Sequence, residues 1–215
     1  MSRTLTLYQT TIGKKVVMAV SGTIIVGFVI GHFLGNLNLY LGPEALNGYA
    51  AKLHSLPALV WGTRILLLFA FGAHITSAYL LWRRNAGARG SQYKKRSDIS
   101  TDYAARTMYW SGPILLLYLI YHLLEFTIIP AHPGDVYRNV VEAFQNPWIS
   151  AFYIAGNLAL GLHIFHGIHS AFQSVGASHP RYDSLRRDLA IAVSAVITVG
   201  NLSFPISVLT GVVTL

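Results

Sequence analysis

The sequence predicts an all-α integral membrane protein, and three observations support this prediction. Of the 215 residues, 53% are hydrophobic and only 11% are charged, whereas soluble domains carry roughly 25% charged residues. Several apolar runs are long enough to cross a hydrocarbon core, which takes about 20 helical residues. Four of the runs also carry a histidine near their middle. We therefore expect five transmembrane helices, with the first four forming one bundle.

The expected spans follow one another with short connections, and no soluble domain or low-complexity segment separates them. We expect one transmembrane domain over residues 1–215, with spans at about 16–40, 58–82, 107–129, 148–173 and 189–213. Pro57 and Pro147 stand at helix starts, where proline is tolerated. Pro113 and Pro205 lie inside the third and fifth spans, where we expect kinks. Residues 1–15 lack the cleavage pattern of a secretory signal, so the first span is expected to be permanent.

The basic residues predict how the chain is oriented. One side of the membrane receives 13 of the 16 lysines and arginines: Arg3, Lys14, Lys15, Arg83, Arg84, Arg89, Lys94, Lys95, Arg96, Arg106, Arg181, Arg186 and Arg187. The other side keeps Lys52, Arg64 and Arg138. By the positive-inside rule, the N-terminus is cytoplasmic and the C-terminus lies outside the bacterial cytoplasmic membrane. The basic residues lie between spans, so the net charge of +8 does not indicate a nucleic-acid partner.

Four histidines, His32, His74, His122 and His163, occupy the first four spans one by one. Ionisable residues inside a bilayer are costly and usually functional. Spans one and three run outward, so His32 and His122 share an outer level, and His74 and His163 share an inner level. At 1.5 Å rise per residue the levels differ by roughly 16 Å. Two facing imidazoles form a bis-histidine haem site. We therefore expect two b-type haems, although a single such histidine is more often an interior hydrogen bonder.

Small residues near the histidines are consistent with flat slots for a macrocycle. The residues that share a helix sector with a histidine, or flank one, are Gly156, Ala159, Gly167, Ser170 and Ser174 for His163, Ala70, Ser77 and Ala78 for His74, and Gly31 and Gly35 for His32. Such stripes also serve close helix–helix contact in membranes. The chain has no cysteine, which excludes disulfides, thiolate-ligated haem and cysteine-bound iron–sulfur clusters in this chain. Any iron–sulfur cluster must belong to another subunit.

The remaining histidines receive weaker interpretations. His166 and His169 approach the inner surface, where either could meet a haem propionate, a quinone or a partner, and an interfacial hydrogen bond is the simpler reading. His54, His132 and His179 fall in connections and are expected to be solvated.

Several segments of the chain resemble one family. They are GHFLGNL at 31–37, GPEALNGYAAKLHSLP at 42–57, FGAHITSAYLLW at 71–82, YHLLEF at 121–126 and FYIAGNLALGLHIFHGIHSAFQSVG at 152–176. The family is the five-helix, two-haem cytochrome b subunit of succinate:quinone oxidoreductases, the membrane anchor of bacterial succinate dehydrogenase and fumarate reductase. The resemblance covers nearly the whole chain.

The resemblance implies a role, ligands and partners. The haem ligands would be His32 and His122 for the outer haem, and His74 and His163, rather than His166, for the inner one. A flavoprotein that interconverts succinate and fumarate and an iron–sulfur subunit would bind on the cytoplasmic side. The electrons would pass to or from a quinone, more often menaquinone than ubiquinone for this type. The chain alone would carry no succinate chemistry, and a higher oligomer of the whole complex stays open.

Two regions could receive the quinone. The outer candidates are Asn36, Asn38, Glu44, Arg64 and Glu125, of which Glu125 lies one turn beyond His122. A carboxylate there can exchange protons with a quinone, and Arg64 could pair with Glu125 or hold a haem propionate. The inner candidates are His166, His169, Gln173 and Trp82. We favour the outer region, because a second haem is needed only if electrons cross the membrane.

Two other functions compete with this one. The haem subunit of a formate dehydrogenase or hydrogenase also uses bis-histidine haems, but its catalytic partners usually face outside. A haem-free proton-coupled transporter would use the same histidines as relay groups.

Overall fold

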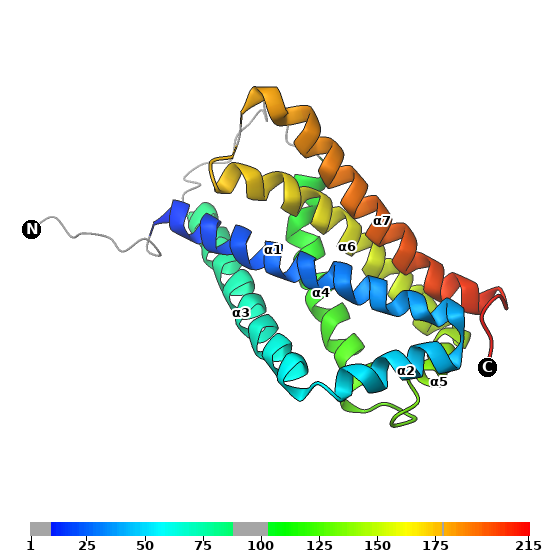
Figure 1. Ribbon diagram of the computed structural model, residues 1–215. Coiled ribbons are helices and arrows are strands. Elements are labelled where there is room, and N and C mark those ends of the chain that lie inside the picture. The colour runs from blue at the N-terminus through cyan, green and yellow to red at the C-terminus, as the bar shows by residue number, and fades with distance from the viewer. Residues whose placement is uncertain (1–9, 88–102, 178) are drawn as a thin grey trace, which may run out of the picture.

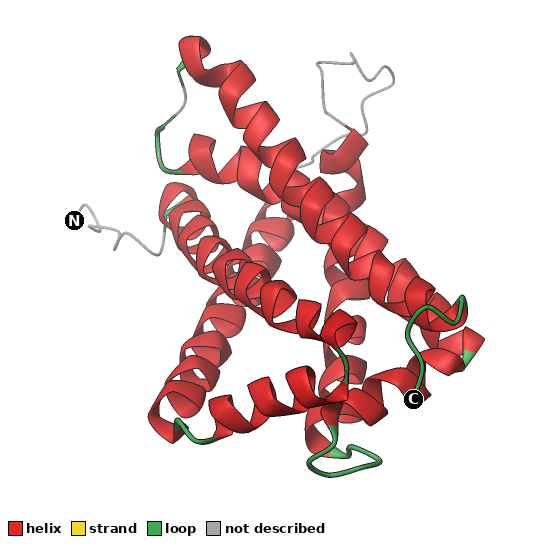
Figure 2. Ribbon diagram, turned by 45° about the vertical axis from the view of Figure 1, so that its right-hand side comes forward, coloured by secondary structure: helices red, strands yellow, loops and turns green. Residues whose placement is uncertain are grey.

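In the computed structural model, residues 10–87, 103–177 and 179–215 are described, and within these ranges the chain forms helices and no strand (Figure 2). The elements in chain order are α1 (Thr11–Asn36), η2 (Leu37–Leu41), α2 (Pro43–His54), α3 (Pro57–Gly87), α4 (Tyr103–Leu123), η3 (Leu124–Ile128), α5 (Val136–Gln145), α6 (Pro147–Ser174), η4 (Pro180–Tyr182) and α7 (Asp183–Leu209). Five stretches are long and apolar enough to cross a membrane: Thr11–Leu41, Pro57–Asn85, Trp110–Ile128, Pro147–Ser174 and Pro180–Leu209. The predicted all-α fold with five membrane-spanning helices is confirmed.

Local sequence signals account for several helix ends. Helices α3 and α6 begin at Pro57 and Pro147, as expected. Helix α7, however, ends at Leu209 and does not continue to about residue 213. Gly211 adopts a φ of 76°, and the Val212 N–H donates to the Ser207 carbonyl at 2.9 Å. A left-handed glycine with this hydrogen bond is a common helix terminator.

Two short helices, α2 and α5, lie in connections that the sequence analysis treated as simple loops. Helix α5 begins at the N-cap Asp135, whose side chain accepts from the Arg138 N–H, and it buries Tyr137, Val141 and Phe144. Neither helix is long enough to span a membrane, so a search for apolar runs overlooks both. They lie together at the end of the bundle that holds the C-terminus (Figure 1). We call this the capped end, and the opposite end, where α1 starts and α3 and α6 end, the basic end.

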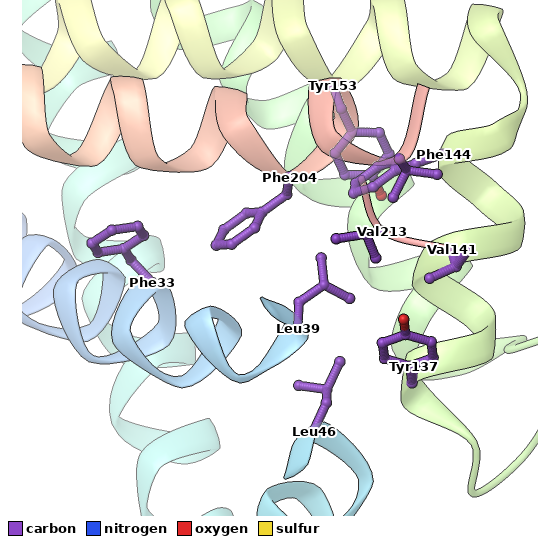
Figure 3. Close-up of a cluster of buried hydrophobic side chains, with 10 residues drawn as sticks. Phe33, Leu39, Leu46, Tyr137, Val141, Phe144, Tyr153, Phe204 and Val213 are labelled. Atoms are coloured by element: carbon purple, nitrogen blue, oxygen red, sulfur yellow. The ribbon is translucent and has the colours of Figure 1, made fainter. Parts of the chain in front are cut away.

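The buried apolar core lies at the capped end (Figure 3). It consists of Phe33, Leu39, Leu46, Tyr137, Val141, Phe144, Tyr153, Phe204, Val208 and Val213. Elsewhere Ile164 and Ile197 are also buried, but many large apolar side chains point outward, and Leu68 and Phe69 are 72% and 71% exposed. An apolar surface of this kind suits lipid. The small helices α2 and α5 therefore pack against the long helices at this end of the bundle.

The long helices pack in the order α3, α1, α6, α4, and α7 lies against α6 and α1. In this arrangement α3 and α6 are diagonal to each other across the bundle, and so are α1 and α4. Side chains that meet across a diagonal must therefore point into the bundle interior.

The basic end collects the described cations that the orientation argument used. Lys14, Arg83 and Arg84 lie there with Arg181, Arg186 and Arg187 (Figure 1). Arg186 is not a solvated loop residue, because it lies in the first turn of α7, is only 4% exposed and pairs with Asp183. Arg3, Arg89, Lys94, Lys95 and Arg96 lie outside the described residues.

Candidate functional site

Two histidine pairs form in the bundle interior. The ring centres of His32 on α1 and His122 on α4 are 5.7 Å apart. Those of His74 on α3 and His163 on α6 are 6.1 Å apart. Each pair joins diagonal helices, and the partners agree with the pairing predicted from depth. We call them the capped-end pair and the basic-end pair.

The spacing of both pairs suits one metal ion held between two imidazoles. An imidazole nitrogen binds a metal at about 2 Å, so ligands on opposite sides of an ion place their ring centres roughly 6 Å apart. Among the described residues no group of three or more His, Cys, Asp or Glu side chains could hold a metal. A haem iron needs only two axial ligands from the protein. The donor set therefore fits haem better than a metal ion bound by protein alone.

The outward-facing nitrogens of the basic-end pair are hydrogen bonded. His74 Nδ1 lies 3.1 Å from the Met18 carbonyl and 3.3 Å from Ser21 Oγ, and His163 Nδ1 lies 3.2 Å from Ser111 Oγ. A carbonyl can only accept, so it favours the tautomer with hydrogen on Nδ1 and leaves Nε2 free. Metal-binding histidines are commonly held in this way. Neither serine could be assigned from the sequence, because each lies on a helix other than that of its histidine.

The capped-end pair has aromatic neighbours instead. His122 stacks on Tyr118 at 6.1 Å between ring centres and meets the edges of Phe126 and Tyr153. Its Nδ1 is buried and has no hydrogen-bond partner among the described residues. His32 stacks on Phe28. The two pairs therefore share a spacing but have different surroundings.

Glu125 lies beside the capped-end pair, in the wide helical turn η3. There the Ile129 N–H donates to the Leu124 carbonyl, five residues back, at 2.9 Å. Such turns are often found at functional sites. Tyr153 and Tyr121 donate from their hydroxyls to the two Glu125 oxygens at 2.7 and 3.1 Å. Glu125 was a candidate from the sequence, whereas neither tyrosine could be assigned to it without the structure.

A cavity of about 260 Å³ opens beside Glu125. It is lined by Glu125, Phe126, Ile129, Ala131, Asn139, Glu142 and Ala143. The cavity therefore joins the last turns of the third span to helix α5 at the capped end.

The other outer candidates lie apart from this cavity. Of the two roles considered for Arg64, the structure does not form the pair with Glu125, because Arg64 lies over the Trp61 ring at 5.1 Å and Tyr121 and Tyr153 bind the Glu125 carboxylate. Asn38 donates to the Gly35 carbonyl at 2.8 Å and closes the end of α1. Asn36 is half-buried at that helix end, and Glu44 is exposed in the first turn of α2.

The inner candidates lie on two helices at the basic end. His166 Nε2 is 2.9 Å from Ser170 Oγ, and Trp82 stacks on Tyr79, so each of these contacts stays within one helix. His169 is half-buried and Gln173 is exposed.

The comparisons with known proteins identify a family for this chain. The family model for the succinate dehydrogenase/fumarate reductase transmembrane subunit matches residues 92–201, slightly more than half of the chain. The chain belongs to this family. No curated protein and no solved structure matched. The matched region contains His122 and His163, and the histidines of the first two spans lie before it.

Family membership defines the chain as a membrane subunit of a succinate dehydrogenase or fumarate reductase complex. Such complexes imply a flavoprotein and an iron–sulfur subunit as partners. The match favours this class over formate dehydrogenases, hydrogenases and transporters.

Some glycines of this transmembrane subunit have a different role from the expected one. A Cβ on Gly35 would lie 2.7 Å from the Tyr49 ring of α2, and one on Gly156 would overlap Tyr118. These two glycines admit aromatic rings, so the slot interpretation is wrong for them. Gly31 and Gly167 face open space, which still suits a macrocycle.

Ser77, near His74, is fully buried and its Oγ has no partner among the described residues.

His132 also departs from its expected role. It was predicted to be solvated, but its Nε2 lies 2.6 Å from Glu142 Oε2, because α5 folds back over the loop. His54 is exposed and bonds within its own helix, and His179 accepts from the Arg181 N–H at the start of η4.

Proposed function

We propose that this chain is a two-haem cytochrome b that carries electrons between its iron–sulfur partner and a quinone in the membrane. The observation that supports this most directly is the presence of two histidine pairs on diagonal helices. Their ring separations of 5.7 and 6.1 Å suit two axial ligands of one iron. Family membership supports the succinate or fumarate partner chemistry.

His32 and His122 would hold one haem, and His74 and His163 the other. A bound b-type haem supplies one-electron exchange between ferric and ferrous iron. Met18, Ser21 and Ser111 would keep the basic-end imidazoles in one tautomer and orientation. The Ser111 contact of His163, and its proximity to His74, favour His163 over His166 as the ligand on α6.

The basic end would face the cytoplasm, in agreement with the positive-inside rule. In that orientation the iron–sulfur partner docks near the basic-end pair. The capped-end pair and Glu125 then lie near the outer face of a bacterial cytoplasmic membrane.

Quinone would react near Glu125. Reduction of a quinone to its hydroquinone takes up two electrons and two protons, and the reverse reaction releases them. Glu125 can accept or give a proton, while Tyr121 and Tyr153 hold its carboxylate in place. Menaquinone is the quinone that the family resemblance implies. The alternative position lies beside His166 and His169 at the basic end.

The proposal is tested by a redox-difference spectrum with haem quantitation on the purified complex. We expect two low-spin b-type haems per copy of this chain, together with a flavoprotein and an iron–sulfur subunit. A preparation that oxidises succinate and contains no haem b in this subunit would overturn the proposal.

A further inference from the structure

A charged cluster at the capped end lies outside the haem and quinone assignments. Glu142 on α5 binds His132 through one oxygen at 2.6 Å and Arg138 Nε through the other at 2.7 Å. The side chains of His132 and Glu142 are 31% and 34% exposed. Both are therefore open to water while held in one place.

The loop that carries His132 is fixed by Asn139. The His132 N–H donates to Asn139 Oδ1 at 2.8 Å, and Asn139 Nδ2 donates to the His132 carbonyl at 2.7 Å. Asn139 is 8% exposed, so this reciprocal pair is sheltered from water. The fold therefore fixes the backbone of the loop that carries the His132 imidazole.

The cavity beside Glu125 reaches this cluster. Glu125 and Phe126 line it on the side of η3, and Asn139 and Glu142 line it on the side of α5. Its volume of about 260 Å³ exceeds the roughly 30 Å³ that one water takes in the liquid. Several waters can therefore connect the two carboxylates.

We propose that Glu142 and His132 are the outer end of a proton route that runs from Glu125 through this cavity to the aqueous phase. The inference rests on the proposed quinone site at Glu125. When a hydroquinone is oxidised, its two electrons go to the iron–sulfur partner and its two protons pass one after the other to Glu125. Each proton moves through cavity water to the cluster and leaves from His132. Reduction of a quinone runs the same transfers backward.

The two side chains of the cluster have different tasks. Hydrogen bonds from Arg138 and then His132 hold the pKa of Glu142 below its ordinary value, so Glu142 remains a carboxylate that attracts protons toward this end. Imidazole is the side chain that exchanges protons near neutral pH. Besides Glu142 and Arg138, the charged neighbour is Asp135, which lies at the start of α5, and Glu125 faces the cavity from η3. Because the His132 side chain is 31% exposed and contacts Glu142, His132 is the group of this route that meets bulk water.

The test uses the whole purified complex with a short-chain menaquinone analogue. His132→Ala should lower quinone-linked turnover on the order of tenfold, and imidazole added to the buffer should restore it. Haem spectra and succinate oxidation with an artificial acceptor should stay unchanged. His54→Ala is the matched control, because His54 is an exposed histidine of α2 that bonds only to the Ala50 carbonyl of its own helix among the contacts described. If His132→Ala does not assemble, His132→Gln keeps a donor to Glu142 and should show the same loss.

The outcomes separate this route from the quinone site. Normal turnover in the His132 variants, or a loss that imidazole does not restore, would overturn the route. If Glu125→Gln is impaired while the His132 variants are normal, the quinone site at Glu125 is retained and only the proton route through His132 is rejected. If Glu125→Gln is also normal, the proposed quinone site is itself wrong.

Discussion

The basic-end and capped-end pairs have nearly the same ring separation but different surroundings. Hydrogen bonds to the Met18 carbonyl and with Ser111 Oγ fix the basic-end imidazoles. The capped-end pair is packed among aromatic rings, with Glu125 nearby. Polar contacts to a ligand tune and orient it, whereas a neighbouring acid can serve a reacting molecule. Under the proposed function, the basic-end pair would serve electron transfer alone, and the capped-end pair would serve electron transfer next to a proton-coupled reaction.

The largest expected effect comes from removing one member of a pair. His122→Ala and His163→Ala should each remove or convert one of the two proposed haems and spare the other, because each pair would supply both axial ligands of its own haem. Haem quantitation and electron paramagnetic resonance measure this. His166→Ala is the control and should keep two low-spin haems. Loss of a haem in that control, with two normal haems in His163→Ala, would contradict the assignment on α6.

A smaller effect is expected at the acid beside the capped-end pair. Glu125→Gln should reduce quinone-linked turnover on the order of a hundredfold, because the amide cannot exchange the proton. Haem content and succinate oxidation with an artificial acceptor should remain at the wild-type level. Unchanged quinone turnover would remove Glu125 from the mechanism, and a quinone bound beside His166 and His169 would move the reaction to the basic end.

Loss of the Ser111 hydrogen bond at the basic-end pair should change the midpoint potential of one haem and leave turnover unchanged. If His163 held a haem iron through Nε2, its Nδ1 would donate to Ser111 Oγ, which would make the imidazole a stronger donor and favour ferric iron. Ser111→Ala should raise the midpoint potential of one haem by a few tens of mV, on the order of one hydrogen bond. Potentiometric titration measures it. Ser194→Ala, which removes a hydroxyl bonded within α7, should change neither haem, and equal shifts in both variants would argue against the contact.

The smallest effect concerns acid stability of the capped end. The Arg138 N–H and then the Asn47 amide hold the pKa of Asp135 below its ordinary value. A depressed pKa means that this stabilisation is complete above the unfolded value, about 3.9, and is lost as the pH falls through the folded value. Hydrogen exchange in α5 should therefore rise below about pH 4 before exchange in α3 does. Asp135→Asn should lose this dependence, and an unchanged acid response in that variant would exclude Asp135 as its cause.

Much of the fold could be read from composition and spacing. The five spans, and the proline starts of α3 and α6, depend on residues close together in the chain. The depth of each histidine depends only on the helical rise and the direction of its span, which is why the pairing could be predicted. The amphipathic helices α2 and α5 gave no such signal, because they are too short and too polar to resemble spans.

What only the tertiary structure decided are the contacts between distant residues. Ser21 and His74 are 53 positions apart, Ser111 and His163 are 52, and Glu125 and Tyr153 are 28. Each contact depends on the order α3, α1, α6, α4 around the bundle and on the rotation of each helix about its axis. The same is true of Gly35 and Gly156. The sequence shows that each leaves a space, but only the packing shows that an aromatic ring fills it. Apolar periodicity determines which residues can enter a membrane, and the packing of side chains between helices determines which of them meet.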